Sequence, residues 1–217
     1  METTIIFDLG GVILPLDTEA TRQKILQLTG KDVKEWMKFG YPHQVIRSFE
    51  LGKLTEKEFF EELSQVLSYE NDLYYLKEAW NAMLMPVPKE NIDFLNQLSE
   101  KYKLILLSNT CETHIQCFEE MLQQTHHIES LELLFDKVYY SCRIGIRKPD
   151  TKIFQKIIKE NHLNPLQTIY FDDTSEHIET AKKLGIQSYL HPQNKPLQEI
   201  LKYILQPHRS SYSQTTI

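Results

Sequence analysis

Short apolar runs rich in β-branched residues recur along the chain and do not alternate with polar residues. Runs of this kind are typical of strands that are buried on both faces of a parallel sheet. Segments with helical periodicity separate the later runs, so the pattern predicts an α/β fold with a doubly wound parallel sheet. The predicted strands are 3–7, 103–107, 137–140, 168–171 and 186–190, and the predicted helices between them are 88–102, 112–124, 150–160, 175–184 and 196–205.

The stretch between the first two predicted strands shows only helical patterns and is too long for a loop. Thr55 and Glu58 have the spacing of a capping box that opens an amphipathic helix. We therefore expect an α-helical cap domain inserted into the core domain. The expected domains are a core of 1–15 and 87–206, a cap of 16–86 with further helices at 17–28, 33–39, 42–50 and 71–84, and a disordered polar tail of 207–217.

Composition limits the classes of partner. The 217 residues, 41% of them hydrophobic, are enough for one core of ordinary size with a helical insertion. A net charge of −6 argues against nucleic acid or an anionic membrane as the main partner, although a bound cation could still admit a small anionic substrate. We expect neither a signal leader nor a membrane span, because no basic segment precedes the first apolar run and no apolar run reaches membrane length; the three cysteines lack metal-binding spacing. We expect a cytoplasmic protein with reduced thiols, and we favour a monomer.

Polar residues follow several predicted strands at the point where each strand ends. Asp8 follows the first strand, Ser108 and Asn109 follow the second, and Asp172 and Asp173 follow the fourth. Lys148, in the segment after the third strand, would reach the same edge. Each group alone could be a turn or helix cap, but ligands bind at the carboxyl ends of parallel strands. Adjacent carboxylates also repel each other unless a cation or a lysine lies close. The order of these groups therefore predicts one functional crevice.

These residues form motifs that resemble the haloacid dehalogenase-like hydrolase superfamily across nearly the whole chain. The resemblance implies a Rossmann-like core with a helical cap, and it implies phosphate ester hydrolysis with Mg²⁺. The four motifs are Ile5-Ile6-Phe7-Asp8-Leu9-Gly10-Gly11-Val12-Ile13, Leu106-Leu107-Ser108-Asn109-Thr110, Gly145-Ile146-Arg147-Lys148-Pro149-Asp150 and Tyr170-Phe171-Asp172-Asp173.

The resemblance also implies a role for each matching position. Asp8 would attack phosphorus and form an aspartyl-phosphate. Mg²⁺ would be held by the Asp8 carboxylate, the backbone carbonyl of Gly10 and Asp173, with water and the phosphate completing six ligands. Ser108 and the amide groups of Asn109 would bind the phosphate oxygens.

Two further positions carry charge in this scheme. Lys148 would neutralise Asp8 against the phosphate and stabilise the transition state. Asp172 would lie in the second shell and orient Lys148 or a metal-bound water. The predicted substrate is a small phosphorylated metabolite, with a sugar phosphate as the best candidate.

One position departs from the family's phosphatases, which usually carry a second Asp two residues after the nucleophile. Here that position is Gly10, which retains a backbone carbonyl but no acid/base group. The α-D-glucose-1-phosphate phosphatases of the superfamily share this glycine, so the chain resembles that branch. Three readings stay open: selectivity for an acidic leaving group, a surrogate acid/base, or a catalytically silent protein that binds phosphorylated metabolites. Haloacid dehalogenase chemistry is a weaker rival, because it gives the paired acids no purpose.

The cap residues give weaker signals. His43 and Arg47 lie one helical turn apart, and they either face the site or lie on a solvated helix face. Gly52 has the position of a glycine that ends a helix. His177 stands where many relatives have another acid.

Overall fold

The computed structural model describes residues 3–36, 43–193 and 195–204. Five parallel strands form one sheet in the order β3-β2-β1-β4-β5. The α/β fold with a doubly wound parallel sheet is therefore confirmed. The strands are β1 (Thr4–Phe7), β2 (Lys103–Ser108), β3 (Lys137–Tyr140), β4 (Thr168–Asp172) and β5 (Gln187–Leu190).

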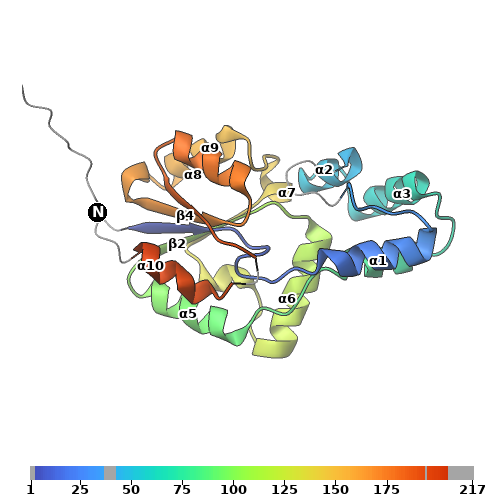
Figure 1. Ribbon diagram of the computed structural model, residues 1–217, viewed down its shortest axis with the longest axis horizontal. Helices are drawn as coiled ribbons and strands as arrows, with labels where there is room; N and C mark the ends of the chain where they lie inside the picture. Colours follow the sequence, from blue (N-terminus) through green and yellow to red (C-terminus); the bar gives the residue numbers. More distant parts are fainter. Residues whose placement is uncertain (1–2, 37–42, 194, 205–217) are drawn as a thin grey trace, which may run out of the picture.

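Helices cover both faces of the sheet, with α8 and α9 above it in Figure 1 and α5, α6 and α10 below it. Successive residues of β1 point to opposite faces, so Phe7 packs in the apolar core beside α5 and α6, and Ile6 packs in the core beside α8 and α9. The helices are α5 (Lys89–Ser99), α6 (Glu112–His126), α7 (Ser141–Ile144), α8 (Thr151–Glu160), α9 (Ser175–Lys183) and α10 (Leu201–Ile204), with short 3-10 helices at Leu131–Leu134, Pro165–Gln167 and Leu197–Ile200.

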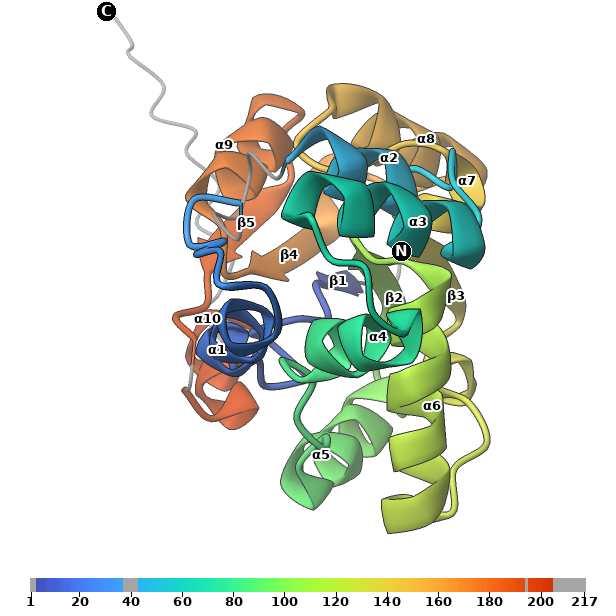
Figure 2. The same ribbon diagram turned by 90° about the vertical axis from the view of Figure 1, so that its right-hand side faces the viewer.

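Among the described residues, the insertion after β1 forms four helices, which share an apolar cluster with Cys111 at the start of α6. They lie beyond the end toward which β1 runs, and Figure 2 views the ends of β1, β2 and β4 behind them. The predicted capping box is confirmed, because Thr55 Oγ1 accepts from Glu58 N and Glu58 Oε2 accepts from Thr55 N. The division into core and cap domains itself stays a prediction. The helices are α1 (Thr18–Thr29), α2 (Gln44–Glu50), α3 (Glu56–Leu67) and α4 (Leu73–Asn81).

Main-chain contacts help to join the insertion to the rest of the chain. The chain that enters the insertion pairs with the chain that leaves it: Leu16 bridges Leu84, and Met85 N donates to Pro15 O at 3.2 Å. After α2, Gly52 has a φ of +65°, as expected for a glycine that ends a helix. A Cβ there would overlap the carbonyl oxygen of Cys142 in α7, so two backbones touch with no side chain between them.

The remaining sequence expectations have mixed outcomes. The helix predicted at 33–39 is a turn over 34–36, and its last residues lie outside the described ranges. The tail expected at 207–217 also lies outside them. The three cysteines are free thiols. In the part of the chain that the structure describes, no helix has the length and apolar character needed to cross a membrane.

Candidate active site

The carboxyl ends of β1, β2 and β4 bring the predicted residues to one place. Asp8 follows β1, Ser108 ends β2, and Asp172 ends β4. Because β1 is flanked by β2 and β4, the crossovers leave it in opposite directions and open a crevice at its end. Asp8, Ser108, Asn109, Lys148 and Asp173 all line a cavity there, with a volume of about 130 Å³.

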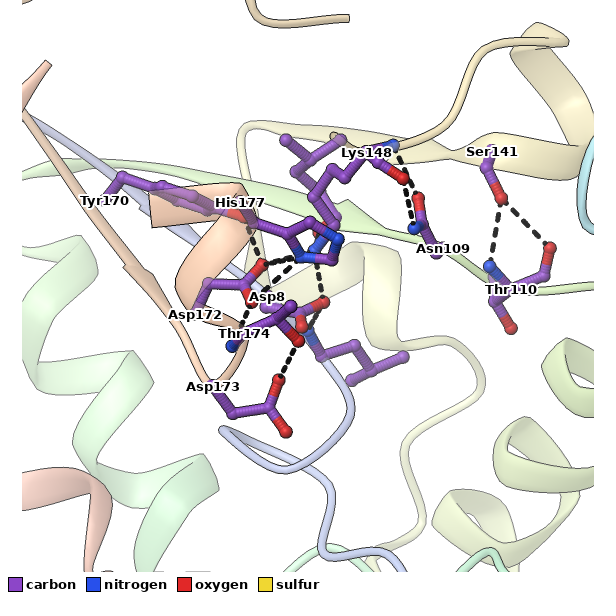
Figure 3. Close-up of polar contacts among 12 residues, drawn as sticks. Asp8, Asn109, Thr110, Ser141, Lys148, Tyr170, Asp172, Asp173, Thr174 and His177 are labelled. Carbon is purple, nitrogen blue, oxygen red and sulfur yellow. Dashed lines mark hydrogen bonds and ion pairs between the residues drawn. The ribbon is translucent and has the colours of Figure 1, made fainter. Parts of the chain in front are cut away.

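Lys148 is the centre of the polar contacts in the crevice (Figure 3). Its Nζ lies 2.8 Å from Asp8 Oδ1 and 2.7 Å from Asp172 Oδ2, and it donates to the Leu107 carbonyl at 3.0 Å. The side chain is only 1% exposed, so a buried ammonium group is balanced by two carboxylates and a carbonyl. Asp172 therefore lies where the sequence predicted, beside Lys148.

The segment that carries Lys148 is held by Asn109. The Asn109 side chain donates to Lys148 O and accepts from Lys148 N, both at 2.9 Å. Sequence reasoning assigned the amide groups of Asn109 to phosphate, but its side-chain amide is already engaged. Its backbone N–H and the second hydrogen of its side-chain NH2 group are left for that predicted contact.

Asp8 and its neighbours have fixed orientations. Asp8 Oδ1 accepts from Leu9 N at 2.7 Å as well as meeting Lys148. Asp172 accepts hydrogen bonds from the Tyr170 hydroxyl and, at 2.7 Å, from Thr174 N, and His177 Nδ1 lies 3.0 Å from its oxygens. Preorganised groups of this kind avoid the cost of reorientation during a reaction.

Three carboxylates meet at this end of the sheet. Asp8, Asp172 and Asp173 each place an oxygen within 4.8 Å of the others. Asp173 is oriented by Gln193 at 2.6 Å and by Thr174 at 3.0 Å. Gly11 has a φ of +75°, and a Cβ there would overlap Asp173 Oδ2, so only glycine lets this loop approach the acid.

The pKa shifts show which carboxylates lack enough positive charge. Burial raises the pKa of Asp8 well above its usual range, the charge of Asp172 raises it further, and Lys148 offsets this only in part. Burial also raises the pKa of Asp173, with Asp172 adding to the shift. Burial alone would raise the pKa of Asp172, but Lys148 and His177 together hold it below its ordinary value. The fold thus compensates Asp172 and leaves Asp8 and Asp173 short of a counter-charge.

A divalent cation suits this deficit. Mg²⁺ prefers oxygen ligands and is commonly held by one or two carboxylates together with substrate phosphate. Asp8 and Asp173 supply such oxygens on one side of the cavity, and the loop bearing Gly10 passes beside them. The residues present therefore fit a magnesium ion.

Gly10, the position that departs from the predicted family pattern, is packed by the cap. A Cβ at Gly10 would lie 2.8 Å from Leu16 Cδ1, so the apolar end of Leu16 occupies the space beside the missing acid. The backbone of Gly10 still lines the cavity.

The cap supplies the other wall of the cavity, including Trp36, Ile46, Glu50 and Trp80. His43 and Arg47 do not line it: His43 accepts a hydrogen bond from Val45 N at the start of α2, and Arg47 is exposed. Of the two readings for this pair, the first, that they face the site, is therefore wrong.

Sequence reasoning missed the roles of Glu50 and Arg147 in this cavity. Glu50 Oε2 lies 2.9 Å from Arg147 Nε, across the boundary between α2 and the segment before Lys148. Burial raises the pKa of Glu50, although Arg147 offsets part of the shift. No local pattern pairs two residues so far apart in sequence, so only the tertiary structure could reveal the contact.

Comparison with known proteins agrees with this geometry. The family model for haloacid dehalogenase-like hydrolases matches residues 5–191. A D-ribitol-5-phosphate phosphatase from Bacteroides thetaiotaomicron is 29% identical over 194 residues, which cover 89% of this chain and 93% of the relative.

Solved structures show the same fold. A predicted hydrolase of this family from Porphyromonas gingivalis has a TM-score of 0.84 at 28% identity, covering 95% of this chain and 99% of that one. A family enzyme from Bacteroides thetaiotaomicron in a magnesium complex has a TM-score of 0.83 at 25% identity, covering 93% and 98%. With a family model that spans most of its length and a site built from the matching residues, this chain belongs to the haloacid dehalogenase-like hydrolase family.

Proposed function

We propose that this protein is a Mg²⁺-dependent phosphatase that hydrolyses small phosphate monoesters, with a sugar or sugar-alcohol phosphate as substrate. The observation that carries the proposal is the arrangement of Lys148 between Asp8 and Asp172, with Asp8 and Asp173 still short of positive charge. A phosphate ester with a divalent cation supplies both the missing charge and the remaining oxygen ligands. The related D-ribitol-5-phosphate phosphatase and the magnesium complex of a structural relative support the same reaction and ion.

The proposed reaction starts with Asp8. Its carboxylate attacks phosphorus, the bond from phosphorus to the ester oxygen breaks, and the leaving alkoxide takes a proton from water as an aspartyl-phosphate forms. Water then attacks phosphorus, which releases inorganic phosphate and regenerates the Asp8 carboxylate. Mg²⁺, when bound, would be held by Asp8, Asp173 and the Gly10 carbonyl, and it would offset the negative charge that separates a carboxylate from a phosphate.

The other residues prepare this step. Lys148 holds Asp8 Oδ1 and brings positive charge next to the site of attack. Asp172 keeps Lys148 in place, because its pKa is held low and it stays ionised. Ser108, which is buried at the end of β2, and the backbone N–H of Asn109 would bind phosphate oxygens.

The branch and the partners stay predictions. The resemblance to α-D-glucose-1-phosphate phosphatases rests on Gly10, and a cytoplasmic monomer rests on composition. Small phosphorylated metabolites are the partners we propose.

The test is phosphate release from a panel of phosphorylated metabolites, with Mg²⁺ or with EDTA. We expect metal-dependent release that falls by about 10⁴-fold or more in Asp8→Asn, because the nucleophile is lost. Asp93→Asn, a matched change on the exposed face of α5, should leave release unchanged. Release that persists in Asp8→Asn would contradict the proposal. Metal-independent halide release from a 2-haloacid would favour dehalogenation, and Mg²⁺ and phosphate binding without turnover would favour a binding protein.

A further inference from the structure

Besides Trp80 Nε1, three buried polar atoms of residues that line the cavity have no hydrogen-bond partner among the described residues. They are Glu50 Oε2, Arg147 Nε and His177 Nε2. Glu50 ends α2 in the cap, Arg147 precedes Lys148, and His177 lies in the first turn of α9. We call these three residues the wall cluster.

The Glu50–Arg147 contact leaves hydrogen-bonding capacity unused. Nε and Oε2 lie 2.9 Å apart as an ion pair, and neither atom has a further hydrogen-bond partner among the described residues. The two side chains are only 19% and 8% exposed. Buried polar atoms with unused hydrogen-bonding capacity in a cavity are expected to meet a ligand or water.

His177 contributes an acceptor to the same wall. Its Nδ1 lies 3.0 Å from both oxygens of Asp172, which assigns the ring proton to Nδ1 and leaves a lone pair on Nε2. The ring is 5% exposed, and the charge of Arg147 acts on both His177 and Glu50. The wall cluster therefore combines a donor, the Arg147 guanidinium, with acceptors on Glu50 and His177.

This mixture of donor and acceptors selects among leaving groups. Glu50 balances the charge of Arg147, so the cluster offers no net positive charge to a second phosphate. An apolar leaving group would leave all three atoms unpaired. Hydroxyl groups both donate and accept, so a polyhydroxylated carbon chain satisfies the cluster. The apolar residues Ile46, Met83 and Leu84, which line the same cavity, suit the C–H surface of such a chain.

We propose that Glu50, Arg147 and His177 form the leaving-group subsite and select phosphate esters whose alcohol carries additional hydroxyl groups. This inference rests on the proposed phosphatase function, because it assigns the phosphate to Asp8 and Lys148 and the alcohol to the wall cluster. The three residues determine specificity through hydrogen bonds to hydroxyls, and they do not act on the phosphorus.

The experiment compares kcat/KM for D-ribitol 5-phosphate with that for n-pentyl phosphate, which has five carbons and no hydroxyls. The intact protein should prefer the polyol ester by about 10- to 100-fold, the range expected for losing a hydrogen bond to a charged group. Glu50→Gln should reduce this ratio about 10-fold or more, chiefly through KM for the polyol ester. A preference near unity in the intact protein, or an unchanged ratio in Glu50→Gln, would overturn the proposal.

Glu56→Gln is the matched control, because Glu56 also joins the cap to the core but does not line the cavity. Its carboxylate lies 2.8 Å from Lys77 Nζ and accepts from Thr113 Oγ1 at 2.9 Å. The ratio in Glu56→Gln should stay within about twofold of the intact protein. If Glu50→Gln does not fold, the double variant Glu50→Gln, Arg147→Gln removes both charges and should show the same loss of preference.

A binding measurement separates this proposal from the proposed function. Free ribitol should bind the protein in the presence of Mg²⁺ and inorganic phosphate, as measured by calorimetry, and pentan-1-ol should bind at least about 10-fold more weakly. Ribitol binding that Glu50→Gln abolishes would support the subsite even if no ester were hydrolysed. Equal binding of ribitol to both proteins, or no binding to either, would overturn it even if phosphate esters were hydrolysed.

Discussion

The two sides of the cavity differ in how completely the fold satisfies their polar groups. At the ends of the strands, Lys148 Nζ meets Asp8, Asp172 and a carbonyl, and Asn109 uses both ends of its side chain on one backbone segment. On the cap side, the paired atoms of Glu50 and Arg147 have no further hydrogen-bond partner among the described residues. In the proposed function, the first side would bind the phosphate, which every substrate shares, and the second would bind the alcohol, which differs between substrates. The more fully hydrogen-bonded groups would then meet the constant part of the ligand, and the groups with unused hydrogen-bonding capacity would meet the variable part.

The largest expected effect comes from removing the central cation of the first side. Lys148→Met leaves the buried Asp8 and Asp172 carboxylates close together without a counter-ion. We expect a loss of about 3–5 kcal/mol in the free energy of unfolding at neutral pH. Urea denaturation with EDTA would measure it. The double variant Glu50→Gln, Arg147→Gln should lose much less free energy of unfolding. If it loses as much as Lys148→Met, the two sides of the cavity do not differ in the way described.

Gly11→Ala should have the next largest effect. The new Cβ would overlap Asp173 Oδ2 and would also occupy a positive φ, which costs about 1–2 kcal/mol for a non-glycine residue. Gly30→Ala is matched, since Gly30 has a φ of +70° and open space around its Cβ position. Calorimetry should show Mg²⁺ affinity reduced by about 10-fold or more in Gly11→Ala only. Equal affinity in both variants would mean that Asp173 does not hold the ion.

Asp8→Asn should stabilise the metal-free protein at neutral pH. The pKa of Asp8 is raised above its ordinary value of 3.8, so the folded state binds this proton more tightly than the unfolded state. Its contribution to stability is full below pH 3.8 and is lost as the pH rises through the folded-state pKa. Thermal unfolding in EDTA should therefore show a higher Tm for Asp8→Asn, by about 2–4 °C for each kcal/mol gained. A lower Tm at neutral pH would show that Lys148 already compensates Asp8 fully.

The smallest expected change in stability is that of Gly10→Asp, at the border between the two sides. Leu16 Cδ1 must move, which should cost about 1 kcal/mol because it is the flexible end of a side chain. If the new carboxyl reaches the leaving oxygen, turnover of an alkyl phosphate should rise by up to about 10²-fold. Gly10→Ala has the same steric cost without the acid and separates the two effects. A loss of turnover in both variants would indicate that the packing of Leu16 is itself required.

The strand ends were predictable because buried parallel strands are continuous apolar runs. The run predicted at 137–140 coincides with β3, and β1, β2, β4 and β5 differ from their predicted bounds by one residue at an end. Acids and a lysine that follow such strands must meet at one edge, so sequence order alone brought Asp8, Lys148 and Asp173 together. Their catalytic and metal-binding roles still await the experiments above.

The cap side was not predictable in the same way. The Glu50–Arg147 contact joins a cap helix to a core loop. The hydrophobic periodicity of a helix predicts which of its faces is buried, but it does not predict which residue of another element that face will contact. His43 and Arg47 had the right spacing for a shared helix face, but spacing does not say whether that face is turned toward the cavity. The hydrogen bonds between the Asn109 side chain and the Lys148 backbone could not be predicted, because only the tertiary structure brings these two residues together.

The close main-chain contact between Gly52 and Cys142 limits which substitutions could give this enzyme new substrates. With main chain against main chain at Cys142, the distance from α2 to the core cannot be changed by exchanging side chains at that point. The reach of Glu50 into the cavity is then fixed by the backbone. A mutant library aimed at longer or bulkier alcohols should therefore spare Gly52 and vary Leu16, Met83 and Leu84 instead, where side-chain volume alone can deepen the cavity.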